Sequence, residues 1–115
     1  MAVIETKEIE QQGLLQTHYY KTSYEKLKDA YIEIIEKLGL RLISIDDNFN
    51  EIFADKGRMS VLAKIIEQNP RETSIDFYID SESIFGAKKK AYALLDKIYS
   101  EIEKIYEIKG YGLHK

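Results

Sequence analysis

The chain has 115 residues, a net charge of −3, 44% hydrophobic and 32% charged residues, and no cysteine. This composition excludes disulfides and cysteine-ligated zinc, and no apolar run approaches the ~20 residues that a membrane-spanning helix needs. The slightly acidic balance argues against the broad cationic surface on which non-specific binding to nucleic acid depends. Acidic residues lie where a signal peptide would need a basic segment. We therefore expect one cytoplasmic domain, 1–115, that does not bind a membrane and for which nucleic acid is a disfavoured partner.

The first part of the chain predicts one strand preceded by a less regular segment. Apolar and polar residues alternate over residues 14–21, as they do in a half-buried strand. The break at Gln11, Gln12 and Gly13 separates that strand from the start of the chain. We expect residues 1–13 to form an N-terminal arm or an additional strand.

A helix is predicted to follow directly. Thr22 and Glu25 have the capping-box spacing, in which the hydroxyl and the carboxylate satisfy free backbone N–H groups at a helix start. Apolar residues then recur at helical spacing as far as Leu38. Gly39 supplies the left-handed residue that commonly ends a helix.

Four consecutive strands are predicted over residues 40–46, 51–55, 59–68 and 73–80. The turns between them are short and rich in Asn, Asp, Gly and Pro, which favours antiparallel neighbours. In the last strand Ile75, Phe77 and Ile79 alternate with polar residues or tyrosine, so one face is expected in the core and the other in water.

A long amphipathic helix is predicted over residues 86–106, and its rise of about 1.5 Å per residue makes it about 30 Å long. The whole chain then predicts an α+β fold: an antiparallel sheet of about five strands with two helices packed on one face, in the order β-α-β-β-β-β-α. This element order resembles TATA-binding-protein-like domains and, more loosely, helix-grip ligand-binding domains. The resemblance is topological and brings no functional residue with it. Residues 107–115 receive no assignment.

Catalytic and metal-binding motifs give little support for an enzyme. His18 and His114 do not lie in any nucleophile motif. Asp76 and Asp80 flank Tyr78 on the polar side of a strand, a spacing that could hold an acid/base pair or a magnesium ion but is more commonly that of a solvated face. A non-catalytic protein is therefore favoured over an enzyme.

The segment from Asp46 to Asn50 has the alternating oxygen ligands with which a calcium loop begins. Such a loop needs glycine at its sixth position and glutamate at its twelfth, where this chain has Glu51 and Gly57. Turn formation explains the pattern better. We expect neither a metal site nor a cofactor.

The last helix carries two candidate small-molecule sites. Gly86 precedes a helix start that carries Lys88, Lys89 and Lys90, and a helix N-terminus attracts anions. Along the flank of the same helix, tyrosines recur every seven residues, with one lysine in line. They could line a cleft for an amphipathic ligand or simply border the core; these residues are Tyr92, Tyr99, Tyr106 and Lys88.

The strand over residues 59–68 is apolar on both faces. Leu62 and Ile66 lie opposite the expected core face, and Tyr78 belongs to the neighbouring strand. An apolar patch of this kind marks an association surface unless the N-terminal arm covers it. We predict a protein that acts by association, as a homodimer or an accessory protein-binding module. The alternative is a domain that binds or senses a small amphipathic or anionic ligand in the tyrosine-lined cleft.

Overall fold

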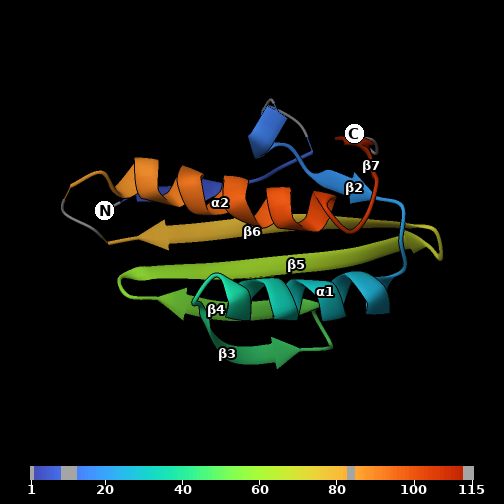
Figure 1. The fold of residues 1–115 in the computed structure, drawn as a ribbon, viewed down its shortest axis with the longest axis horizontal. Helices are drawn as coiled ribbons and strands as arrows, with labels where there is room; N and C mark the ends of the chain where they lie inside the picture. Colours follow the sequence, from blue (N-terminus) through green and yellow to red (C-terminus); the bar gives the residue numbers. More distant parts are fainter. Residues whose placement is uncertain (1, 9–12, 83–84, 113–115) are drawn as a thin grey trace.

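Figure 1 shows the computed structural model of the chain, which describes residues 2–8, 13–82 and 85–112. The strands are β1 (Ala2–Glu5), β2 (His18–Tyr20), β3 (Arg41–Asp46), β4 (Glu51–Lys56), β5 (Met59–Asn69), β6 (Glu72–Ser81) and β7 (Ile108–Tyr111). The helices are α1 (Tyr24–Lys37) and α2 (Ala87–Glu103), and a turn of 3₁₀ helix, η1 (Gly13–Leu15), precedes β2.

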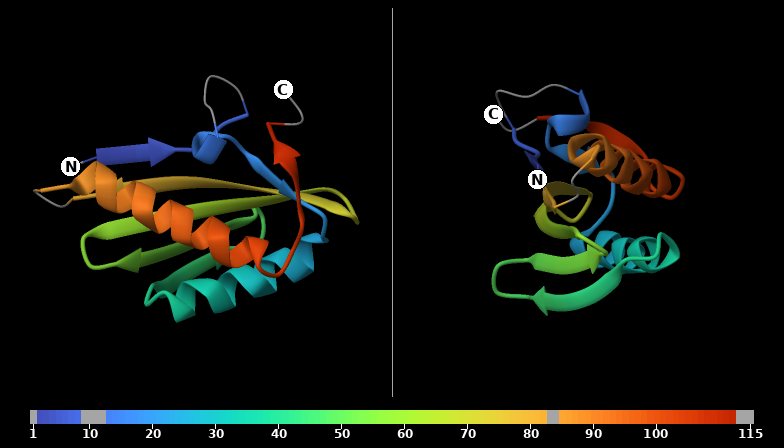
Figure 2. Two further views of the ribbon diagram at one scale, coloured as in Figure 1. Left: turned by 45° about the horizontal axis from the view of Figure 1, so that its top comes forward. Right: turned by 90° about the vertical axis from the view of Figure 1, so that its left-hand side faces the viewer.

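Within the described residues the strands form one antiparallel sheet in the order β3-β4-β5-β6-β2-β7, with β1 also paired to β6. The helices α1 and α2 cover the same face of this sheet (Figure 2). The predicted α+β fold, with its element order, is therefore confirmed, and β1 and β7 enlarge the predicted sheet. None of the helices in the described part of the chain is long and apolar enough to span a membrane.

Strand β6 is shared between two N-terminal strands. Ile4 of β1 lies opposite Ile79, whereas His18 of β2 lies opposite Ile75. Of the described residues between β1 and β2, Thr6 lies directly after β1 and is bonded to β6. The Thr6 backbone N–H donates to Phe77 O at 2.9 Å, and the Phe77 N–H donates to Thr6 Oγ1 at 2.8 Å. Part of the segment 1–13 is thus an additional strand.

Helix α1 begins one residue later than the capping box predicts. Ser23 is the N-cap, and its Oγ accepts from the Lys26 N–H at 3.4 Å. The backbone of Thr22 is instead tied to the sheet, because its carbonyl oxygen accepts from Thr73 Oγ1 at 2.8 Å. At the other end Gly39 has φ +83°, and the predicted left-handed stop is confirmed.

Helix α2 ends earlier than predicted. It stops at Glu103, and the chain then turns to form β7, which pairs with β2 through Tyr19 and Gly110. Because the helix has ended, Ile105 does not join the row of buried apolar residues on α2, and it is 54% exposed. The short β7 was not expected, since four residues carry too little alternation to identify a strand.

The core lies between the helices and the sheet. Helix α1 contributes Leu27, Tyr31 and Ile35, all fully buried. Most of the other buried apolar side chains of the core come from the helix-facing side of β4, β5 and β6 and from the sheet-facing side of α2: Ile52, Ala54, Val61, Ala63, Ile65, Ile75, Phe77, Ile79, Ala91, Leu94, Leu95, Ile98, Tyr99 and Ile102. Four more core residues come from β1, β2, α1 and the segment after α1: Ile4, Tyr20, Ile34 and Leu40.

Candidate interface on the outer face of the sheet

The outer face is the side of β4, β5, β6 and β1 that points away from the helices. Strand register places Phe53 opposite Leu62, Leu62 opposite Tyr78, and Tyr78 opposite Glu5. We call Phe53, Leu62 and Tyr78 the apolar row. Cross-strand neighbours of this kind lie about 5 Å apart, so the three side chains form a continuous strip.

The predicted interface residues do lie on this outer face. Tyr78 is 42% exposed, Ile66 is 38% exposed, and Leu62 is partly exposed. Strand β1 extends the sheet beside β6, and its Glu5 lies next to Tyr78. The N-terminal strand therefore places a carboxylate at the end of the apolar row and leaves Tyr78 and Ile66 exposed to solvent.

Charged residues run along both sides of the apolar row. On one side the register places Glu51 opposite Lys64 and Lys64 opposite Asp76. On the other side lie Asp55 and Asp80, of which Asp55 is held by two hydrogen bonds from the Arg41 guanidinium at 2.9 and 3.2 Å.

A hollow of about 220 Å³ opens at the edge of the apolar row. Leu62 and Tyr78 give it apolar walls. Its described lining residues include three carboxylates, from Glu5, Glu51 and Asp76, and one ammonium group, from Lys64. The hollow therefore combines apolar walls with a surplus of negative charge.

Two threonines, one just after β1 and one just before β2, hold the Asp76 carboxylate in place. Its Oδ1 accepts from Thr6 Oγ1 at 2.6 Å and from Thr17 Oγ1 at 2.7 Å, so it joins the residue after β1 and the residue before β2 to β6. Burial raises the pKa of Asp76 above its ordinary value, the two threonine hydrogen bonds oppose that rise, and the nearby Glu8 and Glu5 carboxylates add to it. A bound cation would relieve this unfavourable charge.

The paired-aspartate hypothesis does not fit the strand geometry. Residues four apart on one strand lie about 13 Å from each other, too far for Asp76 and Asp80 to share a magnesium ion. Within residues 2–8, 13–82 and 85–112, no cluster of three His, Cys, Asp or Glu side chains is arranged to hold a metal.

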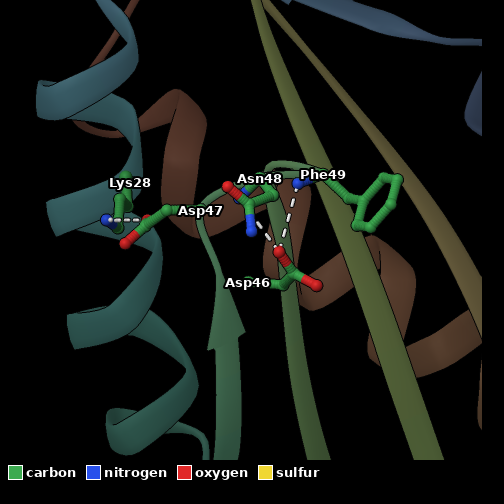
Figure 3. A network of polar contacts seen from close by, with 5 residues as sticks. All are labelled: Lys28, Asp46, Asp47, Asn48 and Phe49. Atoms are coloured by element: carbon green, nitrogen blue, oxygen red, sulfur yellow. Dashed lines mark hydrogen bonds and ion pairs between the residues drawn. The ribbon is translucent and has the colours of Figure 1, made fainter.

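The turn after β3 is a hydrogen-bonded turn (Figure 3). Asp46 Oδ1 accepts from the backbone N–H groups of Asn48 at 2.9 Å and Phe49 at 3.2 Å, and the Asp47 carboxylate accepts from Lys28 Nζ at 3.0 Å. Asn50 then takes a positive φ of 56°, as asparagine readily does. The first ligand of the supposed calcium loop, Asp46, is thus engaged in closing a hairpin.

The structure does not gather the tyrosines of α2 into one cleft. Tyr99 is 2% exposed and stacks on the His18 ring, with a centroid distance of 3.5 Å. Tyr92 is half-buried, with Lys88 Nζ 5.9 Å from its ring centroid. Tyr106 lies beyond the helix end, where its hydroxyl donates to Lys26 O at 3.3 Å. The seven-residue spacing predicts that the three tyrosines lie on one side of a helix. In the structure each of them contacts different neighbours, so they do not share a cleft.

His18 is a core residue of the inner face. It packs against Tyr99 and edge-on against Tyr111, and its Nδ1 lies 2.8 Å from Gln16 O. Burial lowers the pKa of His18 to about 4, although the backbone hydrogen bond opposes the change. His114 lies outside the described residues.

The residues of the predicted anion site at the start of α2 are exposed to solvent. Gly86 is the N-cap in a left-handed conformation, with φ +66°, and Lys88, Lys89 and Lys90 are exposed. Consecutive helix residues point about 100° apart, so the three ammonium groups spread around the helix. Lys88 extends over Tyr92, and Lys90 lines a different hollow with Arg58.

No protein-family model matches the chain, and no curated protein matches it. Function is therefore inferred from geometry. The outer face contains candidate interface residues that sequence reasoning missed, namely Glu5, Glu51, Phe53 and Lys64. They were missed because neighbours on different strands are defined by register, which alternation within one strand does not determine.

Proposed function

We propose that this chain is a non-catalytic protein-binding domain whose outer face binds a partner segment that is both apolar and cationic. The observation that carries the proposal is the hollow of about 220 Å³, where Glu5, Glu51 and Asp76 lie beside the exposed apolar row. We place this binding in the cytoplasm, as predicted from the sequence.

The apolar row supports a contact with apolar side chains. Leu62 and Tyr78 lie on the face opposite the core, so the packing of the helices does not require them to be apolar. Apolar side chains grouped on an exposed sheet face are typical of interaction sites. A leucine or an aromatic residue of the partner would pack across this row.

The hollow supports a basic anchor residue in the partner. An arginine side chain has an apolar stem and a charged head, and it can bury the stem while the head forms hydrogen bonds with carboxylates. Here the stem would lie along Leu62 and Tyr78, and the guanidinium would reach Glu5 or Glu51. Arginine is also among the residues that contribute most to binding energy at interfaces.

A second copy of this chain fits the face less well, because its acidic residues would oppose one another across a symmetric contact. Lys64 could pair with one carboxylate of the other copy, but Glu5, Asp76 and Asp80 would add repulsion. We therefore favour a basic partner over the homodimer.

Calorimetric titration with a short peptide, in which leucine is flanked by arginines, tests the proposal. We expect binding to the unmodified protein, loss of binding in Leu62→Lys, and weaker binding when Glu5 and Glu51 are both replaced by glutamine. Glu36→Gln is the matched control, since Glu36 is exposed on α1. A peptide with glutamates in place of the arginines should not bind.

Sedimentation equilibrium distinguishes between the two possible partners, a basic protein segment and a second copy of this chain. A monomer at high protein concentration, together with peptide binding, supports the basic partner. A dimer that Leu62→Lys dissociates would instead assign the outer face to a second copy. If the peptide binds the Leu62→Lys protein as well as the unmodified one, the outer face is not the binding surface.

A further inference from the structure

A second and larger hollow, of about 500 Å³, lies where α1 begins. Four cationic side chains line it, and each comes from a different segment: Lys21 between β2 and α1, Lys26 in the first turn of α1, Arg71 in the turn between β5 and β6, and Lys109 in β7. Its volume is within the range of small-molecule sites, about 300–1,000 Å³. Only the folded chain brings these charges together.

Two of the four cations are free to meet an anion. Lys109 pairs with Glu72, which is buried, and Lys21 Nζ lies 3.1 Å from the exposed Glu107. Lys26 and Arg71, by contrast, form no ion pair with any residue that the structure describes. The hollow thus presents an ammonium and a guanidinium group whose charge is not balanced by a neighbouring carboxylate.

A buried hydroxyl group without a partner belongs to the same hollow. Thr22 is 6% exposed and lines the hollow, and its Oγ1 has no hydrogen-bond partner among the described residues. Buried polar atoms are rarely left in this state, because each loses its hydrogen bonds to water. A ligand oxygen would satisfy this hydroxyl.

The start of α1 adds less than its position suggests. Glu67 Oε1 already accepts from the Tyr24 N–H at 2.8 Å, and Ser23 Oγ accepts from the Lys26 N–H. An anion in the hollow would therefore be held mainly by the side chains of Lys26, Arg71 and Thr22.

The remaining walls suit an organic group. Tyr106 and Pro70 line the hollow, and the Tyr106 hydroxyl is tied to Lys26 O, which restricts the ring. A tyrosine ring and a proline ring offer flat apolar surfaces beside the charged groups.

We propose that this hollow binds a small organic molecule that carries a phosphate monoester. The doubly charged phosphate lies between Lys26 and Arg71 and accepts a hydrogen bond from Thr22 Oγ1, and the organic part packs against Tyr106 and Pro70. Arginine suits this ligand because its guanidinium can donate two parallel hydrogen bonds to phosphate. The site shares no residue with the outer-face hollow, so it stands or falls independently of the proposed protein binding.

The experiment is a calorimetric titration with phenyl phosphate, inorganic phosphate and phenol, repeated on Arg71→Gln and Arg58→Gln. Arg58 is the matched control because it also lies in a turn between two strands, β4 and β5, and is also exposed. We expect phenyl phosphate to bind more tightly than inorganic phosphate, and phenol not to bind. Arg71→Gln should weaken binding about tenfold, as expected for a lost charged hydrogen bond, and Arg58→Gln should leave it unchanged.

Thr22→Val tests the hydroxyl directly. Valine has nearly the same shape, and the hydroxyl has no partner to lose, so the urea midpoint should stay the same or rise. Phenyl phosphate binding should nevertheless weaken. Equal losses in Arg71→Gln and Arg58→Gln, equal binding of phenol, or undiminished binding in Thr22→Val would overturn the proposal. Tighter binding of a phosphoserine peptide than of phenyl phosphate would overturn the choice of a free small molecule.

Discussion

The two faces of β5 and β6 make an instructive comparison, because they belong to the same strands and follow the same alternation. On the inner face Val61, Ile65, Ile75 and Ile79 are fully buried beneath the helices. Neither α1 nor α2 covers the outer face (Figure 2), where Leu62 is partly exposed and Ile66 is 38% exposed. The inner composition is explained by the fold. The outer composition has no such explanation, which is why we assign it to binding.

The sharpest contrast is between adjacent isoleucines on β5. Ile65 is 0% exposed and Ile66 is 38% exposed. We predict that Ile65→Ala lowers the free energy of unfolding by about 2–5 kcal/mol, as removal of a buried aliphatic side chain does. Ile66→Ala should change it by less than about 1 kcal/mol, because little packing is lost. Urea unfolding of the two variants measures the difference, and similar effects would contradict the two-face description.

His18, on the inner face, should make the stability of the fold depend on pH. Its pKa changes from an ordinary value of 6.5 in the unfolded chain to about 4 in the fold. Between these values the unfolded chain binds a proton that the folded chain does not, so stability falls as the pH decreases from 6.5 toward 4. The full difference corresponds to about 3 kcal/mol.

The matched variant is His18→Phe, which keeps a flat ring against Tyr99. Stability measured by urea unfolding should then depend less on pH across that window than in the unmodified protein. Asp76 acts in the opposite sense, because its raised pKa makes the folded state gain protons and stability as the pH falls. An unchanged pH profile in His18→Phe would show that this ring is not buried in its neutral form.

A smaller effect is expected from the two aspartates of β6. Asp76→Ala should destabilise the fold by about 1–3 kcal/mol, since the buried hydroxyls of Thr6 and Thr17 lose their acceptor. Asp76→Asn retains an acceptor oxygen and removes a partly buried charge, so its effect should be smaller. Asp80→Asn is the control, because Asp80 Oδ1 has no hydrogen-bond partner among the described residues. Thermal unfolding that ranked Asp80→Asn above Asp76→Ala would contradict the anchoring role.

Much of the fold could be predicted because its long elements are strongly periodic. Alternation in β6 and helical spacing in α1 identified both elements within a few residues of their ends. The short strands β1 and β7 gave no comparable signal, since their positions depend on pairing with β6 and β2. The cap of α1 moved from Thr22 to Ser23 because Thr73, far along the chain, holds the Thr22 backbone.

The candidate site was predictable only in part, for the same physical reason. Leu62, Ile66 and Tyr78 stood out because apolar residues at outward positions break a simple alternation. Their charged neighbours Glu5 and Glu51 come from other strands, and only the register places them at one hollow. The tyrosine spacing did not produce a cleft on α2, because the His18 ring of β2 stacks on Tyr99.

The most direct test of the outer-face assignment is to follow methyl-group resonances during titration with the leucine–arginine peptide. Leu62 and Ile66 report on the outer face, and Ile65 and Ile79 on the inner face of the same strands. We predict that the Leu62 and Ile66 signals shift in proportion to bound peptide while those of Ile65 and Ile79 stay nearly constant. No shift at Leu62 and Ile66, or larger shifts at Ile65 and Ile79, would contradict the assignment.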